Sequence, residues 1–305
     1  MVHLGQGGLL MDYLELNLAF HVNHQLQVSS DLSSAMRGLW GRSLKKIYCY
    51  QKQLDCTQCS FENCPYYVLF EKKLSSFEQY HPYIIQSRFY PPDIVMAKFK
   101  FFGWICEHQE KLINSVLNLN HTILTRDGVE TPLNLIDIRD GYNNLLWTEN
   151  EVSIARPKTR ILKYRPQTID ILELELKTPL RQKNQGRLMD RFSWEGFSKS
   201  IIGRIRYLDA HFNRGTLQLP TNLDLGNPRI LQIDTSWSEK IRLSYRQEAK
   251  MSIGGLIGKI VLQDVTPEMV GILKLARYLH AGKQCSFGNG EIGLRNLSDS
   301  SAPKT

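Results

Sequence analysis

Residues 172–181, with the sequence Leu-Glu-Leu-Glu-Leu-Lys-Thr-Pro-Leu-Arg, contain the pattern that decides the fold. Leucines at every second position alternate with glutamates, which is typical of a strand that buries one face. Apolar residues then recur at helical spacing from Trp194 to Leu208, and Ser193 stands in position to cap that helix. These patterns predict a strand followed by a helix.

The same kinds of element continue toward the C-terminus. Residues Ser252–Gln263 are predicted to form a strand punctuated by glycines. A last helix begins with Thr266 as its cap and Pro267 at its first position, and it reaches about Leu279.

The first half of the chain opens with a similar pair. Residues Leu14–Val22 alternate like the strand above, and a helix follows from Leu32 to Ile47 behind the possible caps Ser30 and Asp31. Between Pro91 and Asp140 no single period stands out. We expect two α+β modules of the split βαβ type, one in residues 1–155 and one in 156–297, with a flexible tail over 298–305.

Composition agrees with two globular domains and favours a polyanionic partner. The chain has 305 residues, 42% of them hydrophobic, which excludes a disordered protein, a collagen or a small disulfide scaffold. Its formal net charge is +8. Residues 156–214 hold fourteen Lys/Arg against six Asp/Glu, so this block accounts for the whole excess and suggests a surface that meets phosphates.

No segment predicts export or membrane insertion. The apolar stretch 9–22 is interrupted by Asp12, Glu15 and Asn17, so it fits neither a signal peptide nor a membrane span. We therefore expect a cytoplasmic protein without a membrane partner. In that compartment cysteines are free thiols or metal ligands more often than disulfides.

Four cysteines in the insertion 49–64 have the spacing C-x6-C-x2-C-x4-C, formed by Cys49, Cys56, Cys59 and Cys64. Four thiolates in one short loop can close a tetrahedral zinc shell, and we prefer a structural zinc here. The Cys64-Pro65 pair keeps an iron–sulfur cluster as an alternative, and unligated thiols as another. Since four protein ligands leave no open position for water, we expect no catalytic metal.

A glycine-rich loop follows the last helix, from His280 to Gly293. Its spacing satisfies GxGxxG, but only twelve residues follow, too few for the helix and strand of a dinucleotide fold. Bare backbone of this kind can approach a phosphate or another backbone segment closely, and the spacing does not decide between them.

Several motifs in order along the chain resemble a known family. They are Thr178–Arg181, Gln185–Leu188, Ser244–Gln247 with Gly254–Gly258, Leu279–Lys283, and Phe287–Gly290 in the second half, and Met36–Leu44, Cys64–Tyr66 and Leu69–Glu71 in the first. Together they are similar to the RAMP superfamily, and in particular to a cysteine-bearing branch of the sixth Cas family, the CRISPR-associated endoribonucleases that process precursor crRNA.

That resemblance implies tandem ferredoxin-like domains and metal-independent cleavage of RNA. The ribose 2′-hydroxyl would attack the adjacent phosphorus, leaving a 2′,3′-cyclic phosphate and a 5′-hydroxyl. Histidine suits the proton transfers because it titrates near neutral pH. The candidates are His280 beside the glycine loop, and His24 and His21 at the end of the first strand, a region that supplies the base in many relatives. The other histidines, including His121, are predicted to have no role.

The resemblance also implies an RNA-binding set of cations, aromatic residues and loop glycines. Its members are Arg37, Arg42, Lys45, Lys46, Arg204, Arg206, Tyr245, Arg246, Gly282, Lys283, Phe287, Gly288 and Gly290. The expected partners are CRISPR repeat RNA, a retained crRNA hairpin and subunits of an effector complex. The alternative function is a non-catalytic RAMP subunit that only binds crRNA, and a weaker one is a zinc-dependent adaptor of unrelated fold.

Overall fold

The chain divides into two units between Arg160 and Ile161 in a computed structural model of the protein. The N-terminal unit comprises Asp12–Arg160, and the C-terminal unit comprises the residues from Ile161 onward together with the start of the first strand. The boundary predicted from the sequence lies between residues 155 and 156. The structure describes residues 10–23, 31–51, 54–56, 58–59, 64–72, 80–126, 129–150, 154–184, 186–217, 219–244 and 249–298.

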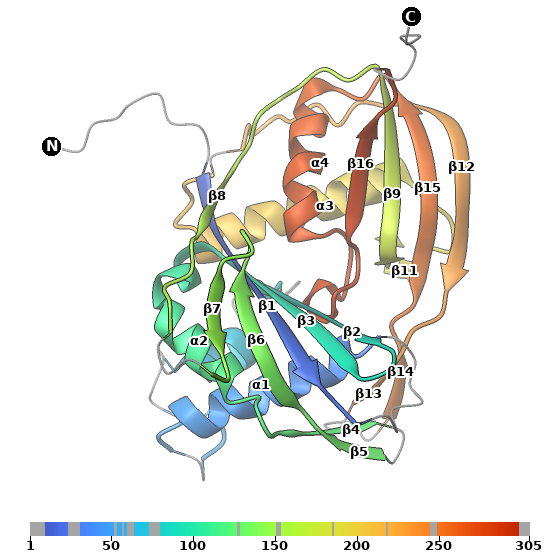
Figure 1. The fold of residues 1–305 in the computed structure, drawn as a ribbon. Coiled ribbons are helices and arrows are strands. Elements are labelled where there is room, and N and C mark those ends of the chain that lie inside the picture. Colours follow the sequence, from blue (N-terminus) through green and yellow to red (C-terminus); the bar gives the residue numbers. More distant parts are fainter. Residues whose placement is uncertain are drawn as a thin grey trace, which may run out of the picture. The chain divides into compact units, whose positions relative to one another are not determined.

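The N-terminal unit has the element order βαββαβ of a ferredoxin-like fold. Its main elements are β1 (Leu10–His21), α1 (Ser33–Tyr48), β2 (Tyr83–Tyr90), β3 (Ile94–Phe102), α2 (Gln109–Leu117) and β6 (Asn134–Asp140). The strands pair antiparallel in the order β2-β3-β1-β6-β7, as the fold requires (Figure 1). Smaller elements are η1 (Tyr67–Glu71), η2 (Gly103–His108), the hairpin of β4 (Ile123–Arg126) and β5 (Val129–Pro132), and β7 (Leu145–Thr148).

The C-terminal unit repeats this order. It is built from β9 (Ile171–Leu180), α3 (Trp194–Phe212), β12 (Arg229–Ser238), β15 (Gly255–Gln263), α4 (Pro267–Leu279) and β16 (Ile292–Asn296), in the sheet order β12-β15-β9-β16 (Figure 1). Minor elements are β8 (Arg160–Lys163), the hairpins β10 (Lys183–Asn184) with β11 (Arg187–Leu188) and β13 (Ile241–Ser244) with β14 (Ala249–Ser252), and η3 (Cys285–Phe287). The predicted tandem ferredoxin-like fold is confirmed.

The predicted side-chain caps of α3 and α4 are confirmed. The Ser193 side chain accepts a hydrogen bond from the Gly196 backbone at the start of α3, and Thr266 accepts one from Met269 at the start of α4. Such caps satisfy backbone N–H groups that have no partner within the helix. At α1 the predicted cap Asp31 is wrong, because the N-cap is Leu32, whose side chain makes no cap hydrogen bond; Asp31 lies one residue earlier and accepts from the Ser33 N–H, and Ser30 lies outside the described residues.

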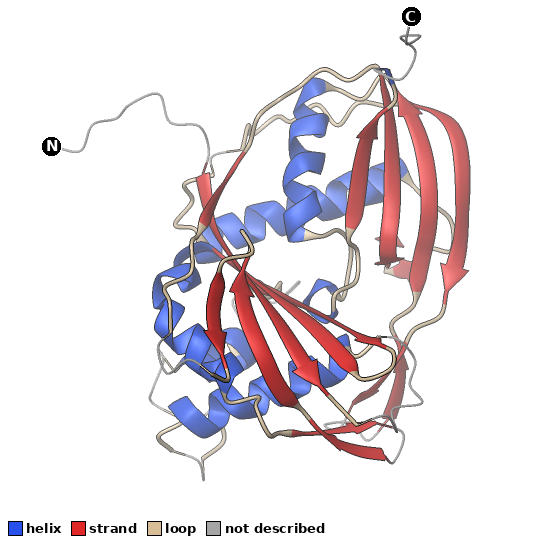
Figure 2. Cartoon of the chain, viewed as in Figure 1, coloured by secondary structure: helices blue, strands red, loops and turns tan. Residues whose placement is uncertain are grey.

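The core of the N-terminal unit is centred on Trp40 of α1. Its ring contacts Tyr83, Phe99 and Phe101 on the sheet, with centroids 5.0, 5.7 and 5.6 Å away. Its indole N–H donates to the Ser115 hydroxyl of α2 at 2.8 Å. One side chain thus joins both helices to the same face of the sheet, and Figure 2 shows both helices on that side.

The other face of this sheet carries mostly polar residues. Along β1 the side chains alternate, with Leu16, Leu18 and Phe20 buried under the helices. Asn17 and His21 project from the opposite, open face. A β-bulge at Ile136 shifts the pairing of β6 with β1 by one residue, so Asn134 lies opposite His21.

No helix within the described ranges is long and apolar enough to cross a membrane.

Asp140 at the end of β6 fixes the turn that leads into β7. Its buried carboxylate accepts hydrogen bonds from the backbone N–H groups of Tyr142, Asn144 and Lys158, and from the Asn144 side chain. Burial raises the pKa of Asp140, but these donors outweigh it and bring the pKa below the ordinary value of 3.8.

Replacing Asp140 with asparagine should therefore destabilise the protein by about 2 kcal/mol at neutral pH. The amide keeps one acceptor oxygen but places an NH2 group against N–H donors that the other carboxylate oxygen accepted. Because the folded-state pKa is lowered, this contribution exists above the unfolded pKa and disappears as the pH falls through the folded one. Chemical denaturation at pH 7 and pH 3 measures both effects. Asp137→Asn, which breaks only a partly exposed ion pair with Arg139, should cost much less.

Candidate nucleic-acid interface

His280, the first candidate for proton transfer, has no exposed surface. It follows directly after α4 with φ at 60°, and its ring Nδ1 lies 2.9 Å from the carbonyl oxygen of Asn289. An imidazole enclosed in this way does not reach an RNA sugar unless the loop opens. The geometry therefore favours a structural role for His280, contrary to the expectation that a phosphate docks beside it.

The glycine-rich loop packs closely against other backbone. A Cβ atom on Gly290 would lie 1.8 Å from the Ala281 carbonyl oxygen, and one on Gly282 would lie 2.6 Å from that of Arg181. Gly288 is also buried, with φ at 79°. Of the two interpretations that the spacing left open, the structure favours backbone packing, so these glycines do not present an exposed phosphate cradle.

Polar groups of the same loop bind within the C-terminal unit. The Lys240 ammonium donates to the Phe287 carbonyl at 3.0 Å and to Asn289 Oδ1 at 2.9 Å. The Asn289 amide donates to the Ile253 carbonyl at 2.7 Å, and Asn289 is fully buried. This network holds the loop in one conformation.

The other proposed RNA contacts of the C-terminal unit differ in accessibility. Arg204 is 2% exposed and donates from Nε to the Leu279 carbonyl at 2.6 Å, so it joins α3 to the end of α4 instead of facing solvent. Phe287 is 7% exposed, too little to stack on a base. Arg206 is exposed and donates to the carbonyls of Pro220 and Thr221, and Lys283 is half-buried. Tyr245 and Arg246 lie outside the described residues.

The cations of α1 fall into two pairs. Arg42 and Lys46 are exposed. Arg37 is half-buried with its guanidinium 4.8 Å above the Phe70 ring, and the Lys45 ammonium lies 5.4 Å from the centre of the Tyr66 ring. Since cation–π contacts hold the second pair, Arg42 and Lys46 are the better candidates for phosphate contact.

His21 is the accessible member of the histidine candidates that the structure describes, because His24 lies outside the described residues. The His21 side chain is 48% exposed at the end of β1. Its Nε2 lies 3.3 Å from Oδ2 of Asp93, in the turn between β2 and β3. The backbone N–H of Val22 donates to the Asp93 carbonyl at 2.8 Å, which fixes this turn beside the strand end.

The open face around His21 combines cations with exposed rings. Strand pairing brings Arg88 and Tyr90 of β2, Lys98 of β3 and Arg139 of β6 onto the same face as His21. Tyr90 is 48% exposed, enough to stack on a base. Lys98 lies 3.5 Å from Glu15, and this cation contributes to lowering the Glu15 pKa against the effect of burial.

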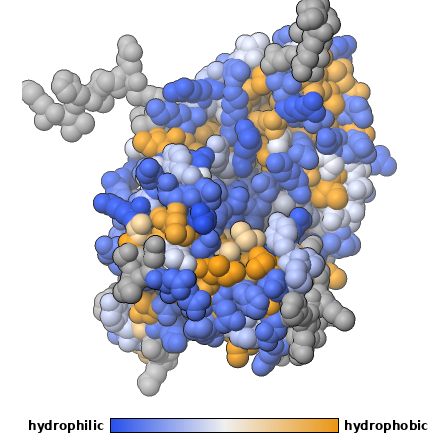
Figure 3. Space-filling view, viewed as in Figure 1, coloured by the Kyte–Doolittle hydropathy of each residue, from blue (hydrophilic) through white to orange (hydrophobic). Residues whose placement is uncertain are grey.

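In one module with a four-stranded sheet, the RRM, aromatic residues on the open face stack on bases of single-stranded RNA. In the view of Figure 3 the surface is mostly hydrophilic, with hydrophobic residues in separate patches. This set could not be found from motifs, because Arg88, Tyr90 and Lys98 belong to none. The strand register places them on the same sheet face as His21.

The four cysteines are free and partly exposed. Burial raises the pKa of the Cys56 thiol, and Cys49 and Cys64 lie near enough to influence it as well. Across the described residues no three His, Cys, Asp or Glu side chains are arranged to hold a metal ion. A zinc or iron–sulfur site at these cysteines stays a prediction from their spacing.

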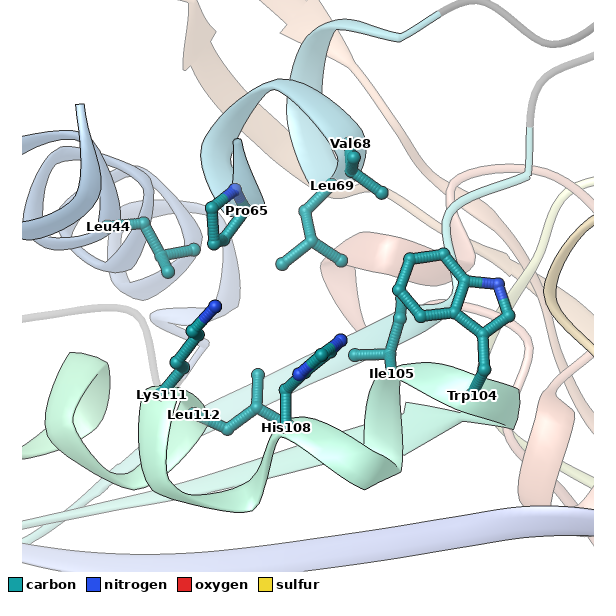
Figure 4. Close-up of a pocket in the computed structure, with 9 residues that line it drawn as sticks. All are labelled: Leu44, Pro65, Val68, Leu69, Trp104, Ile105, His108, Lys111 and Leu112. Atoms are coloured by element: carbon teal, nitrogen blue, oxygen red, sulfur yellow. The ribbon is translucent and has the colours of Figure 1, made fainter. Parts of the chain in front are cut away.

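A pocket of about 290 Å³ lies beside this insertion in the N-terminal unit. Figure 4 shows Leu44, Leu69 and Leu112 on its walls, with His108 beside Leu112 and Trp104 at the right. Its lining is mainly apolar, so it does not add to the polar open face.

Comparison with known families assigns the C-terminal unit. Residues 174–292 match the family model described as CRISPR-associated endoribonuclease Cas6. These residues form a Cas6-family domain. The family prediction is thus confirmed, while a second model, described only as an N-terminal domain, matches residues 10–161. None of the curated proteins matches the chain significantly.

Solved Cas6 structures share the fold of the whole chain. A product complex of a Cas6 protein is 11% identical, with 93% of this chain and 100% of that chain covered and a TM-score of 0.56. Cas6 from Thermus thermophilus is 11% identical over 95% of this chain and 100% of its own, with a TM-score of 0.50. A partial Cas6-RT-Cas1–Cas2 complex is 11% identical over 93% of this chain, which spans 46% of that longer chain, with a TM-score of 0.54.

The loop packing predicts a large cost for a single methyl group. Gly290→Ala should destabilise the Cas6-family domain by roughly 3 kcal/mol, because it adds a side chain at φ 75° and against the Ala281 carbonyl. Gly203→Ala is the matched control, since its Cβ on α3 meets nothing within 4 Å and alanine favours a helix. Denaturant unfolding should separate the two, and equal stabilities would contradict the packing argument.

The cysteine spacing predicts about one zinc ion per chain. Elemental analysis of purified protein should find zinc at that ratio, and Cys56→Ser should lose it, while Cys106→Ser, which changes a buried cysteine outside the cluster, should retain it. Iron with visible absorption would indicate a cluster instead. Protein without metal and with all four thiols open to a thiol reagent would contradict both.

Proposed function

We propose that the protein is an endoribonuclease that cleaves precursor crRNA at its repeat sequences without a metal ion. The observation that carries the proposal is the exposed His21–Asp93 pair on an open sheet face that also carries Arg88 and Tyr90, in a chain that contains a Cas6-family domain. His280, the other candidate histidine that the structure describes, is fully buried.

The proposed reaction is an internal transesterification. The 2′-oxygen loses its proton to a base and bonds to phosphorus, and the bond from phosphorus to the 5′-oxygen breaks as that oxygen gains a proton. Products are a 2′,3′-cyclic phosphate and a 5′-hydroxyl. In this proposal His21 takes the proton of the 2′-hydroxyl. The Asp93 carboxylate orients the ring and stabilises the imidazolium that forms.

The second requirement of the reaction is stabilisation of the negative charge that develops on the phosphorane. Arg88 of β2 lies on the same sheet face as His21, and a cation that meets the transition state more closely than the substrate lowers the barrier. Tyr90 would stack on a base beside the cut. The exposed Arg42 and Lys46 of α1 would make further phosphate contacts on the helix side of the N-terminal unit, and Arg206 and Lys283 would make others in the C-terminal unit; such contacts favour retention of the hairpin product.

Two solved relatives are consistent with this function. One is described as a Cas6 product complex, and another as part of a Cas6-RT-Cas1–Cas2 complex. By analogy we propose repeat RNA as the substrate of this chain and other Cas proteins as its partners. The substrate has to be RNA, because the nucleophile is its own 2′-hydroxyl.

Cleavage of end-labelled repeat RNA in excess chelator tests the proposal. Wild-type protein should yield a cyclic-phosphate end, and a 2′-deoxy substitution at the cut site should block the reaction. His21→Ala should slow cleavage by about 100-fold or more while RNA binding persists. His108→Ala, a change of another exposed histidine in the same unit, should leave the rate unchanged.

The same assay distinguishes the proposed enzyme from the alternative function. RNA that is bound in a salt-dependent manner but stays intact would contradict the enzyme and favour a non-catalytic crRNA-binding subunit. Cleavage that survives His21→Ala would contradict the assigned base, and His24→Ala would then be the next variant.

A further inference from the structure

The proposed reaction transfers two protons. The inference made here rests on the proposed function and concerns the second proton, which the leaving oxygen receives. One group accepts the proton of the 2′-oxygen, and another supplies a proton to the leaving 5′-oxygen. His21 fills the first role only. A second imidazole near the same end of the sheet would complete the pair.

His121 lies in that position. It is exposed in the turn after α2, and its backbone has φ at 59°, a conformation that residues other than glycine rarely adopt. Two hydrogen bonds hold the turn to the start of β6. The His121 N–H donates to the Leu133 carbonyl at 2.7 Å, and Asn120 Oδ1 accepts from the Leu135 N–H at 2.8 Å.

Asn134 connects the two histidines. His121 Nδ1 lies 3.3 Å from Asn134 Oδ1, and Asn134 is the direct cross-strand partner of His21 between β6 and β1. Directly opposed residues in an antiparallel pair lie about 5 Å apart and project from the same face. The row across the end of the sheet is therefore Asp93, His21, Asn134 and His121.

We propose that His121 is the general acid of the cleavage reaction. The partners of the two rings distinguish their roles. A carboxylate beside His21 stabilises the positive charge that a base acquires, whereas His121 faces a neutral amide oxygen. With its Nδ1–H donating to that oxygen, His121 gives the Nε2 proton to the 5′-oxygen as the bond to phosphorus breaks. The amide of Asn134 positions the ring.

A repeat RNA with sulfur in place of the bridging 5′-oxygen at the cut site tests this role, because a thiolate leaves without a proton at neutral pH. His121→Asn is the variant, since asparagine tolerates a positive φ. It should cleave ordinary RNA about 100-fold more slowly than wild type and the sulfur-containing RNA within about fivefold of wild type. His21→Asn should be slow on both substrates, and His108→Asn on neither.

Two results would overturn the assignment. Either His121→Asn cleaves ordinary RNA at the wild-type rate, or it is equally slow on both substrates, which indicates a structural role. Should melting experiments show that His121→Asn is misfolded, His121→Gln provides the same comparison. A wild-type protein inert toward both RNAs would overturn the proposed function itself, and this inference with it.

Discussion

The alternation of side chains along β1 is the constraint on which the N-terminal unit depends. Every second residue is buried under α1 and α2, so the residues between them must face outward. Trp40 anchors the buried side and leaves no freedom to exchange the two faces. The chemistry that we assign to the open face is thus a consequence of how the core is packed.

In the C-terminal unit, packing buries the residues that the motif singles out. The loop motif that resembles Cas6 relatives holds its glycines, His280 and Asn289 inside the unit, bonded to backbone and to Lys240. Residues that look suited to bind phosphate therefore close a loop between α4 and β16. This is a reminder that a motif identifies a family more reliably than it identifies the atoms that touch a ligand.

Sequence patterns predicted the strands and helices with a clear period, such as β9 and α4, together with their caps at Ser193 and Thr266. No elements were predicted between Pro91 and Asp140, and within this segment β6 has no regular period because adjacent Leu135 and Ile136 stand at a bulge. Among the site residues, His21 could be found from its place at a strand end. Asp93 and His121 could not, because strand register and a turn, rather than spacing along the chain, bring them to the same edge.

That bulge has a consequence for evolution and for design. If Ile136 instead paired regularly with Phe20, Leu135 would lie opposite His21 and Asn134 would turn toward the helices. The extra residue therefore keeps an amide, and not a leucine, beside the imidazole. Deletion of Ile136 would remove the bulge but leave Asn134 opposite His21, so related chains with one residue fewer at this point would keep the arrangement.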